Sequence, residues 1–162
     1  FPWLTVEKNM RIPLEISGLE EKEIRKKVSG IMRDFSINSL KERYPSSLSG
    51  GEKQKTALAR TMASDPELLL MDEPFSAIDA LTREELQDFL KDLLKGKKIT
   101  TLIVTHSIEE AVYLADTIYI MGKKPSEGFV SAYRSGQDFT DRKDPAFFSH
   151  INNIRLIMES TR

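Results

Sequence analysis

The chain has 162 residues, 40% hydrophobic and 30% charged, which is enough for one domain with a buried core. Its 24 Lys and Arg nearly balance its 25 Asp and Glu, so composition excludes a global field that favours nucleic acid or an anionic membrane surface. The lack of cysteine excludes disulfides and thiolate metal sites and is compatible with a reducing cytosol, and no apolar run approaches the ~20 residues that cross a bilayer.

The chain opens on an apolar aromatic run at residues 1–6, typical of the middle of a domain rather than of a targeting sequence. We therefore expect further residues ahead of it. Over residues 20–35 apolar positions recur at helical spacing with charges on the opposite face, which predicts an amphipathic helix. A shorter helix is expected at residues 39–43, before Pro45 interrupts it.

A polar loop at residues 46–51 then precedes a predicted helix over residues 53–64. Asp65-Pro66 closes that helix because the residue before a proline disfavours helical backbone. The apolar run at residues 68–71 predicts a short buried strand.

The next helix is predicted to begin at a T-x-x-E capping box formed by Thr82 and Glu85, and Gly96 suits its C-terminal end. Residues 99–105 are β-branched and apolar, as expected for a strand buried on both faces of a parallel sheet. A second capping box, Ser107 with Glu110, predicts another short helix after that strand.

Residues 117–121 return to strand character, and the resulting β-α-β-α-β alternation predicts an α/β fold with a parallel sheet. Beyond Gly122 the chain is more polar, with a candidate strand at residues 129–133 and a candidate final helix at residues 145–159.

Two short motifs carry candidate chemistry. Ser49-Gly50-Gly51, ahead of a helix, offers a hydroxyl, two unobstructed backbone N–H groups and the positive end of a helix dipole, all of which suit a phosphate. Asp72-Glu73 ends a predicted strand, and ligands of open α/β folds bind at the carboxyl ends of strands. Taken singly, the first motif also fits an ordinary serine N-cap and the second a solvated strand-to-turn boundary.

Together these motifs resemble the signature motif (L-S-G-G-x-x-Q, residues 48–54) and the Walker B motif (residues 68–74) of ATP-binding-cassette (ABC) ATPases. Ser76-Ala77-Ile78-Asp79 is similar to that family's D-loop, and His106 to its switch histidine. No G-x-x-x-x-G-K-[ST] phosphate loop occurs in the chain. The resemblance thus implies a partial P-loop NTPase fold, a parallel sheet flanked by helices plus a helical subdomain, that lacks its N-terminal portion.

The resemblance also implies roles for individual residues. Asp72 binds Mg²⁺, Glu73 is the general base for the attacking water, and His106 senses the γ-phosphate and holds that water. The cofactors implied are ATP and Mg²⁺.

The remaining roles lie at an interface between two ATPase chains. Ser49, Gly50, Gly51 and Gln54 contact ATP held by the partner subunit, and Asp79 lines the interface of the homodimer or heterodimer. In contrast, His150 has no motif around it and is expected to be a polar residue satisfied by nearby backbone.

The aromatic opening is similar to the segment after the glutamine of the Q-loop in nitrate, sulfonate and taurine importers, although that glutamine is absent. The resemblance implies a helical subdomain at residues 1–47 that contacts transmembrane permease subunits, an ATPase core at residues 48–121, and a C-terminal tail at residues 122–162. It implies a cytoplasmic protein, peripheral on the inner face of the membrane, served indirectly by a solute-binding protein and with no nucleic acid partner.

Two alternatives remain open from the sequence. One is a soluble ABC ATPase of DNA repair or chromosome maintenance, although sustained heptads and cysteines are lacking. The other is a non-catalytic interaction module, which the missing phosphate loop favours and the presence of Glu73 and His106 disfavours. Neither the transported solute nor the direction of transport is written in the chain.

Overall fold

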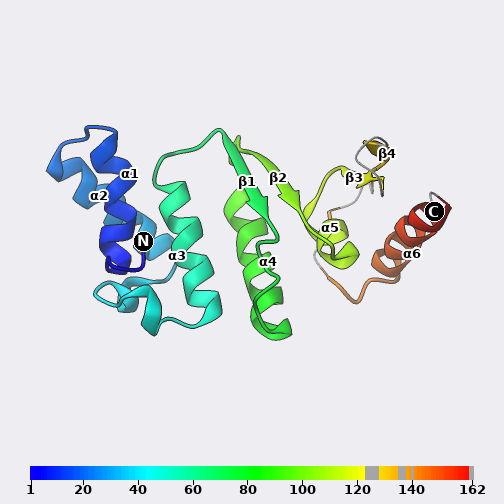
Figure 1. Ribbon diagram of the computed structural model, residues 1–162, viewed down its shortest axis with the longest axis horizontal. Helices are drawn as coiled ribbons and strands as arrows, with labels where there is room; N and C mark the ends of the chain where they lie inside the picture. The colour runs from blue at the N-terminus through cyan, green and yellow to red at the C-terminus, as the bar shows by residue number, and fades with distance from the viewer. Residues whose placement is uncertain (123–127, 135–137, 140, 161–162) are drawn as a thin grey trace. The chain divides into compact units, whose positions relative to one another are not determined.

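A computed structural model describes residues 1–122, 128–134, 138–139 and 141–160 (Figure 1). The chain forms two compact units, Phe1–Leu102 and Ile103–Arg162. The described residues contain six α-helices and two two-stranded sheets, which confirms the predicted α/β class.

The first helix, α1 (Val6–Ile16), was not predicted from the sequence. Thr5 caps it by accepting a hydrogen bond from the Lys8 N–H, at 3.4 Å. Val6, Met10 and Leu14, spaced four residues apart, are buried along one stripe. This spacing was the available signal, and the proline inside the helix obscured it.

The amphipathic helix predicted over residues 20–35 is confirmed as α2 (Glu21–Asp34), with Glu20 as its N-cap. The helix expected at residues 39–43 is wrong: a 3₁₀ turn, η1 (Asn38–Leu40), is found instead. The N–H groups of Leu40, Lys41 and Arg43 each donate to the carbonyl three residues back, which is the 3₁₀ pattern, and the carbonyls of Lys41 and Arg43 accept hydrogen bonds from the first turn of α1.

A second 3₁₀ turn, η2 (Pro45–Ser47), leads into α3 (Gly50–Met62). Helix α3 begins three residues earlier than predicted, so both signature glycines lie in its first turn rather than in a loop. Buried apolar residues of α1, α2 and α3 form the core of the first unit: Val6, Met10, Leu14, Ile24, Val28, Met32, Phe35, Ile37, Leu40, Leu48, Ala59, Met62 and Ala63.

Strands β1 (Leu68–Asp72) and β2 (Thr100–Val104) run in the same direction and form a two-stranded sheet, connected through α4 (Ala80–Leu94) (Figure 1). The expectation that both strands are buried is wrong. Leu69 is buried, but Leu70 is 64% exposed and Leu102 is 56% exposed. Alternate residues of both strands point to a face that the described residues leave uncovered.

Helix α4 also begins differently from the prediction. Its N-cap is Asp79, whose carboxylate accepts a hydrogen bond from the Thr82 N–H at 3.1 Å, so the predicted capping box of Thr82 and Glu85 is wrong. Asp79, three residues upstream, accepts the hydrogen bond from the N–H of Thr82, so Thr82 lies inside the helix and does not cap it. Gly96 follows the C-cap residue with φ of +72°, the left-handed conformation that glycine favours and that was expected of this stop.

The second unit contains α5 (Ile108–Leu114), the antiparallel pair β3 (Ile118–Met121) and β4 (Phe129–Tyr133), and α6 (Pro145–Ser160). Ser107 caps α5 as predicted by accepting from the Glu110 N–H. Helices α5 and α6 pack together over a core of Val112, Tyr113, Ile120, Phe139, Phe147, Ile151 and Ile154.

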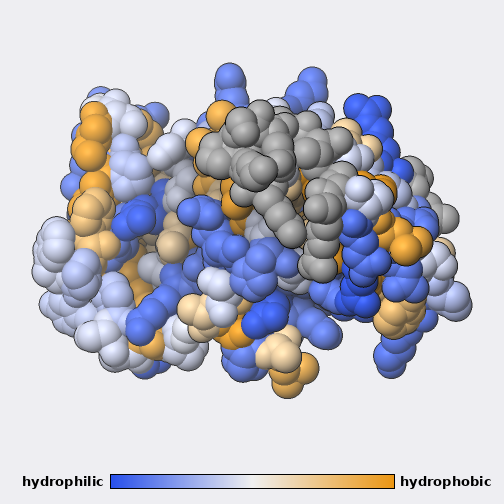
Figure 2. Space-filling model, turned by 45° about the vertical axis from the view of Figure 1, so that its right-hand side comes forward, coloured by the Kyte–Doolittle hydropathy of each residue, from blue (hydrophilic) through white to orange (hydrophobic). Residues whose placement is uncertain are grey.

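His150 lies on α6, where its Nδ1 atom hydrogen-bonds the Tyr133 hydroxyl. The expectation that backbone groups satisfy this histidine is therefore wrong. Over the face shown in Figure 2, hydrophilic side chains prevail and apolar residues form separate patches, in keeping with the balanced composition.

Candidate functional site

Ser49 is the N-cap of α3 and is joined to Glu52 by two reciprocal hydrogen bonds. The Glu52 N–H donates to the Ser49 hydroxyl at 3.2 Å, and the Ser49 N–H donates to the Glu52 carboxylate at 2.7 Å. This capping box fixes the direction in which the helix begins. The S-x-x-E spacing that signals it is present in the sequence, and our reading of the signature overlooked it.

Two backbone N–H groups at this helix end lack an acceptor. Among the residues that the structure describes, the N–H groups of Gly50 and Gly51 find no hydrogen-bond acceptor. Ser49 and Gly50 are exposed, whereas Gly51 is buried. The first turn of a 13-residue helix therefore presents unpaired donors and a positive dipole end, as an anion requires.

The two signature glycines differ in how closely other elements approach them. A Cβ atom on Gly51 would lie 2.5 Å from the Thr82 Cγ2 atom in the first turn of α4. On Gly50 the nearest neighbour would be the carbonyl oxygen of Ala77, at an ordinary 3.5 Å. The signature end of α3 therefore packs directly against residues 76–82, and Gly51 is the residue that permits this approach.

Asp72 and Glu73 lie where β1 ends and the chain turns. Asp72 is exposed, and Glu73 is half-buried with a φ of +46°. Its carbonyl oxygen accepts hydrogen bonds from the Ser76 N–H and the Ser76 hydroxyl, at 3.3 and 3.0 Å. Left-handed backbone at a residue other than glycine costs about 1 kcal/mol, and such costs concentrate at functional sites.

The left-handed turn at Glu73 differs in setting from the other described cases. Ser36 and Asp65 also have positive φ, and both follow the ends of helices, where this conformation is common. Glu73 instead follows a strand.

Asp79, predicted to line a dimer interface, serves within this chain as the N-cap of α4. The hydrogen bond from the Thr82 N–H lowers the pKa of its carboxyl group below the usual value. Because the side chain remains exposed, capping leaves part of it open to solvent. Its role at an interface stays a prediction.

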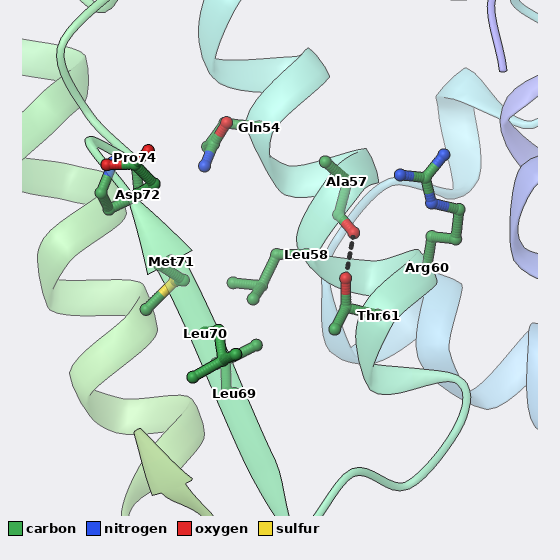
Figure 3. Close-up of a pocket in the computed structure, with 10 residues that line it drawn as sticks. All are labelled: Gln54, Ala57, Leu58, Arg60, Thr61, Leu69, Leu70, Met71, Asp72 and Pro74. Atoms are coloured by element: carbon green, nitrogen blue, oxygen red, sulfur yellow. Dashed lines mark hydrogen bonds between the residues drawn. The ribbon is translucent and has the colours of Figure 1, made fainter. Parts of the chain in front are cut away.

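A shallow hollow lies between α3 and β1 (Figure 3). Gln54 and Arg60 line it from the helix, Asp72 lines it from the strand end, and the rest of the lining is mainly apolar. In Figure 3 the Gln54 side chain extends from α3 toward the end of β1. The structure thus brings one signature residue and one Walker B residue to the same hollow within a single chain.

His106 lies between β2 and α5, in the second unit. It is exposed, directly ahead of the Ser107 that caps α5. The expected contact of His106 with the water held by Glu73 stays a prediction. Arg43, which the sequence did not single out, lies 3.6 Å from the carboxylate of Glu52 and so supports the capping box of the signature.

The donor groups at this site fit a nucleotide and its magnesium ion. The described residues contain no group of three or more acidic or histidine side chains that could enclose a metal. A single exposed carboxylate, Asp72, is nonetheless the donor set that Mg²⁺ uses when phosphates and water complete its shell. The unpaired N–H groups of Gly50 and Gly51 suit phosphate oxygens.

The class of protein follows from comparison with known sequences. Residues 1–76 match the family model for ABC transporters. The chain is also 42% identical, over 76% of its length, to an uncharacterized ABC transporter ATP-binding protein of Methanocaldococcus jannaschii. With the order of motifs described above, these matches identify the chain as a member of the ABC transporter ATPase family.

Two relatives are ATP-binding proteins of importers. The aliphatic sulfonates import ATP-binding protein SsuB of Bacillus licheniformis is 46% identical over 77% of the chain and 48% of its own length. The nitrate import ATP-binding protein NrtD of Synechocystis is 33% identical over 98% of the chain and 63% of its own length. The chain therefore spans about half the length of the sulfonate-import relatives and somewhat more of the nitrate-import relative. Within the described residues, no helix is long and apolar enough to cross a membrane.

Proposed function

We propose that the protein to which this chain belongs binds and hydrolyses ATP as the energising subunit of an ABC importer. The observation that carries this proposal is the pairing of an open, serine-capped helix end at Ser49 with a strand that ends in Asp72 and Glu73. Such a pairing offers donors for a phosphate and carboxylates for a metal and a water molecule.

In this proposal, each ATP is held between two chains. Ser49, Gly50 and Gly51 of one chain face the nucleotide of its partner, while Asp72 and Glu73 act on the nucleotide of their own chain. The exposure of Ser49 and Gly50 supports this division, because a helix end that serves a partner must be open to it. Gln54, which lines a hollow together with Asp72, is assigned with Ser49, Gly50 and Gly51 to the nucleotide of the partner chain.

Asp72 is proposed to hold Mg²⁺, which when bound with ATP neutralises charge on the phosphates. Glu73 accepts the proton of the attacking water, and the turn that follows it fixes the direction of its backbone. His106 supplies a second polar contact to that water. Asp79 keeps the first turn of α4 in place beside the signature helix.

The partners are proposed to be a second ATPase chain and transmembrane permease subunits, with a solute-binding protein acting through the permease. Two of the relatives are named for import of aliphatic sulfonates and of nitrate, which favours import of a small anion over DNA repair. Such a subunit works on the cytoplasmic side of the membrane, as a peripheral protein.

The test uses the protein expressed from the complete reading frame that encodes this chain. Replacing Glu73 by Gln keeps size and polarity but removes the base, so steady-state ATP hydrolysis should fall by ~10²-fold or more. Glu67→Gln, at the exposed start of the same strand region, is the matched control and should keep normal turnover. Near-normal hydrolysis by the Glu73 variant would take the role of base away from Glu73.

A further inference from the structure

Asn9 is a polar side chain buried in the apolar face of α1. It is 3% exposed and is flanked by the fully buried Val6 and Met10. Asparagine is a poor helix former, and burying its amide is costly unless every polar atom is paired. Its presence at this position therefore requires partners that an apolar residue could not serve.

Those partners all lie in the five residues that precede the helix. The two hydrogens of the Asn9 Nδ2 group are shared among the carbonyl oxygens of Phe1, Leu4 and Thr5, which lie 3.0, 3.1 and 3.0 Å away. The side-chain NH2 group thus binds the backbone of residues 1–5, which is not part of any regular element.

The segment that Asn9 binds also contacts the signature helix. The guanidinium of Arg60, on α3, lies over the Phe1 ring at 5.1 Å from its centroid, within the range of a cation–π contact. The Trp3 ring contacts Phe1 on the segment itself, with a centroid distance of 5.6 Å. Arg60 is also among the residues that line the hollow between α3 and β1, but its guanidinium extends away from β1 in Figure 3.

We propose that Asn9 is a positioning residue that holds residues 1–5 in one backbone conformation and thereby places the Phe1 ring against the guanidinium of Arg60 on α3. The contacts run from the buried Asn9 amide, through the backbone of residues 1–5, to the Phe1 ring and then to the Arg60 guanidinium. This inference goes beyond the proposed function, because it concerns the order of the segment and does not require ATP hydrolysis.

The first test measures hydrogen–deuterium exchange of the peptide that contains residues 1–5, in the protein expressed from its complete reading frame. Asn9→Leu keeps the size of the side chain and removes the hydrogen bonds that its NH2 group donates to the Phe1, Leu4 and Thr5 carbonyls. Exchange in this peptide should become faster by about tenfold or more, since the segment loses its buried partner. Asn153→Leu, on an exposed position of α6, is the matched control and should leave the rate within about twofold.

The second test asks whether Asn9 acts on Arg60 through Phe1. In the NMR spectrum of the parent protein, the Arg60 side-chain resonances should show the upfield shift that an adjacent aromatic ring produces. Phe1→Leu should abolish this shift without speeding exchange in residues 1–5, whereas Asn9→Leu should do both. A role in stability alone would not move the Arg60 resonances of a folded variant.

Unchanged exchange together with an unchanged Arg60 shift in folded Asn9→Leu protein would overturn the proposal. If that variant does not fold, the parent protein still decides. The two Nδ2 protons of Asn9 should then exchange at least about tenfold more slowly than those of the exposed Asn153. Equal rates for the two side-chain amides would show that Asn9 does not bind the segment.

Discussion

Adjacent glycines of the signature should respond oppositely to the same small substitution. Replacing glycine by alanine within a helix stabilises it by about 0.5–1 kcal/mol, because alanine restricts the unfolded chain and favours helical backbone. At Gly50 nothing opposes this gain, since the nearest atom to the added Cβ would be 3.5 Å away. Gly50→Ala is therefore expected to leave the free energy of unfolding unchanged or slightly higher.

At Gly51 the same methyl group would lie 2.5 Å from Thr82 Cγ2 and 3.7 Å from Leu86 Cδ1. Thr82 is β-branched and sits in the first turn of α4, so it has few rotamers with which to move aside. Overpacking of this kind costs about 1–3 kcal/mol. Because the helical gain is the same in both variants and cancels, Gly51→Ala should be less stable than Gly50→Ala by about 1–3 kcal/mol.

The assay is urea denaturation of both variants and the parent, followed by circular dichroism, with the protein expressed from its complete reading frame. Each variant adds one methyl group to the same helix turn, so each is the control for the other. The double variant Gly51→Ala with Thr82→Ser removes the opposing methyl group and should recover most of the loss. Equal stabilities for the two single variants would refute the close packing of α3 against α4.

Three further expectations follow from the described contacts. Asp79→Ala should lower the thermal midpoint, because α4 loses its N-cap, whereas Asp79→Asn should lose less; equal losses would contradict capping. The pKa of the Glu21 carboxyl group is lowered to about 2, first by the hydrogen bond from Arg11 and then by that from Arg25. Since a depressed folded pKa stabilises only the ionised form, the contribution of Glu21 should be present above pH 4.5 and disappear as the pH falls toward about 2. Comparing melting curves of Glu21→Gln and parent protein across that range checks the sign. Finally, Leu70→Ser should reduce light scattering by the 162-residue chain, because Leu70 lies on the exposed apolar face of the sheet.

Local patterns predicted the elements from α2 onward well, and they failed where tertiary contacts decide. Helix α1 was not predicted, although Val6, Met10 and Leu14 have the four-residue spacing of a buried helix stripe, because Pro13 interrupts the pattern. The helix predicted at residues 39–43 is replaced by a 3₁₀ turn, and the carbonyls of Lys41 and Arg43 bind the first turn of α1, a contact that no local pattern encodes.

Competition between capping residues explains another difference. Both Asp79 and Thr82 are acceptable N-caps, and the sequence pattern T-x-x-E favoured the second. In the structure Asp79 is the N-cap, so α4 begins at Ala80, and the interface role of Asp79 stays a prediction. Strand burial was overestimated because apolar, β-branched composition indicates a capacity for burial and says nothing of which residues provide it.

The residues of the candidate site could be predicted from the sequence, but their backbone conformation and packing could not. Motif order singled out Ser49, Asp72 and Glu73, and the structure places them at a helix start and a strand end, as expected. The left-handed backbone of Glu73 and the close approach of Gly51 to α4 depend on three-dimensional packing, so the sequence alone did not indicate them.

In the proposed mechanism, the signature residues and the Walker B residues of one chain serve two different ATP molecules. This division can be tested by mixing two inactive forms of the whole protein: one with Ser49→Arg, which obstructs the signature helix end, and one with Glu73→Gln. A mixed dimer would contain one site with both an intact Ser49 and an intact Glu73. An equal mixture that has exchanged subunits should therefore recover roughly a quarter of the parent ATP hydrolysis, because half of the dimers are mixed and each holds one intact site. No gain over the separate preparations, with subunit exchange verified, would contradict the claim and place both motifs at a single nucleotide.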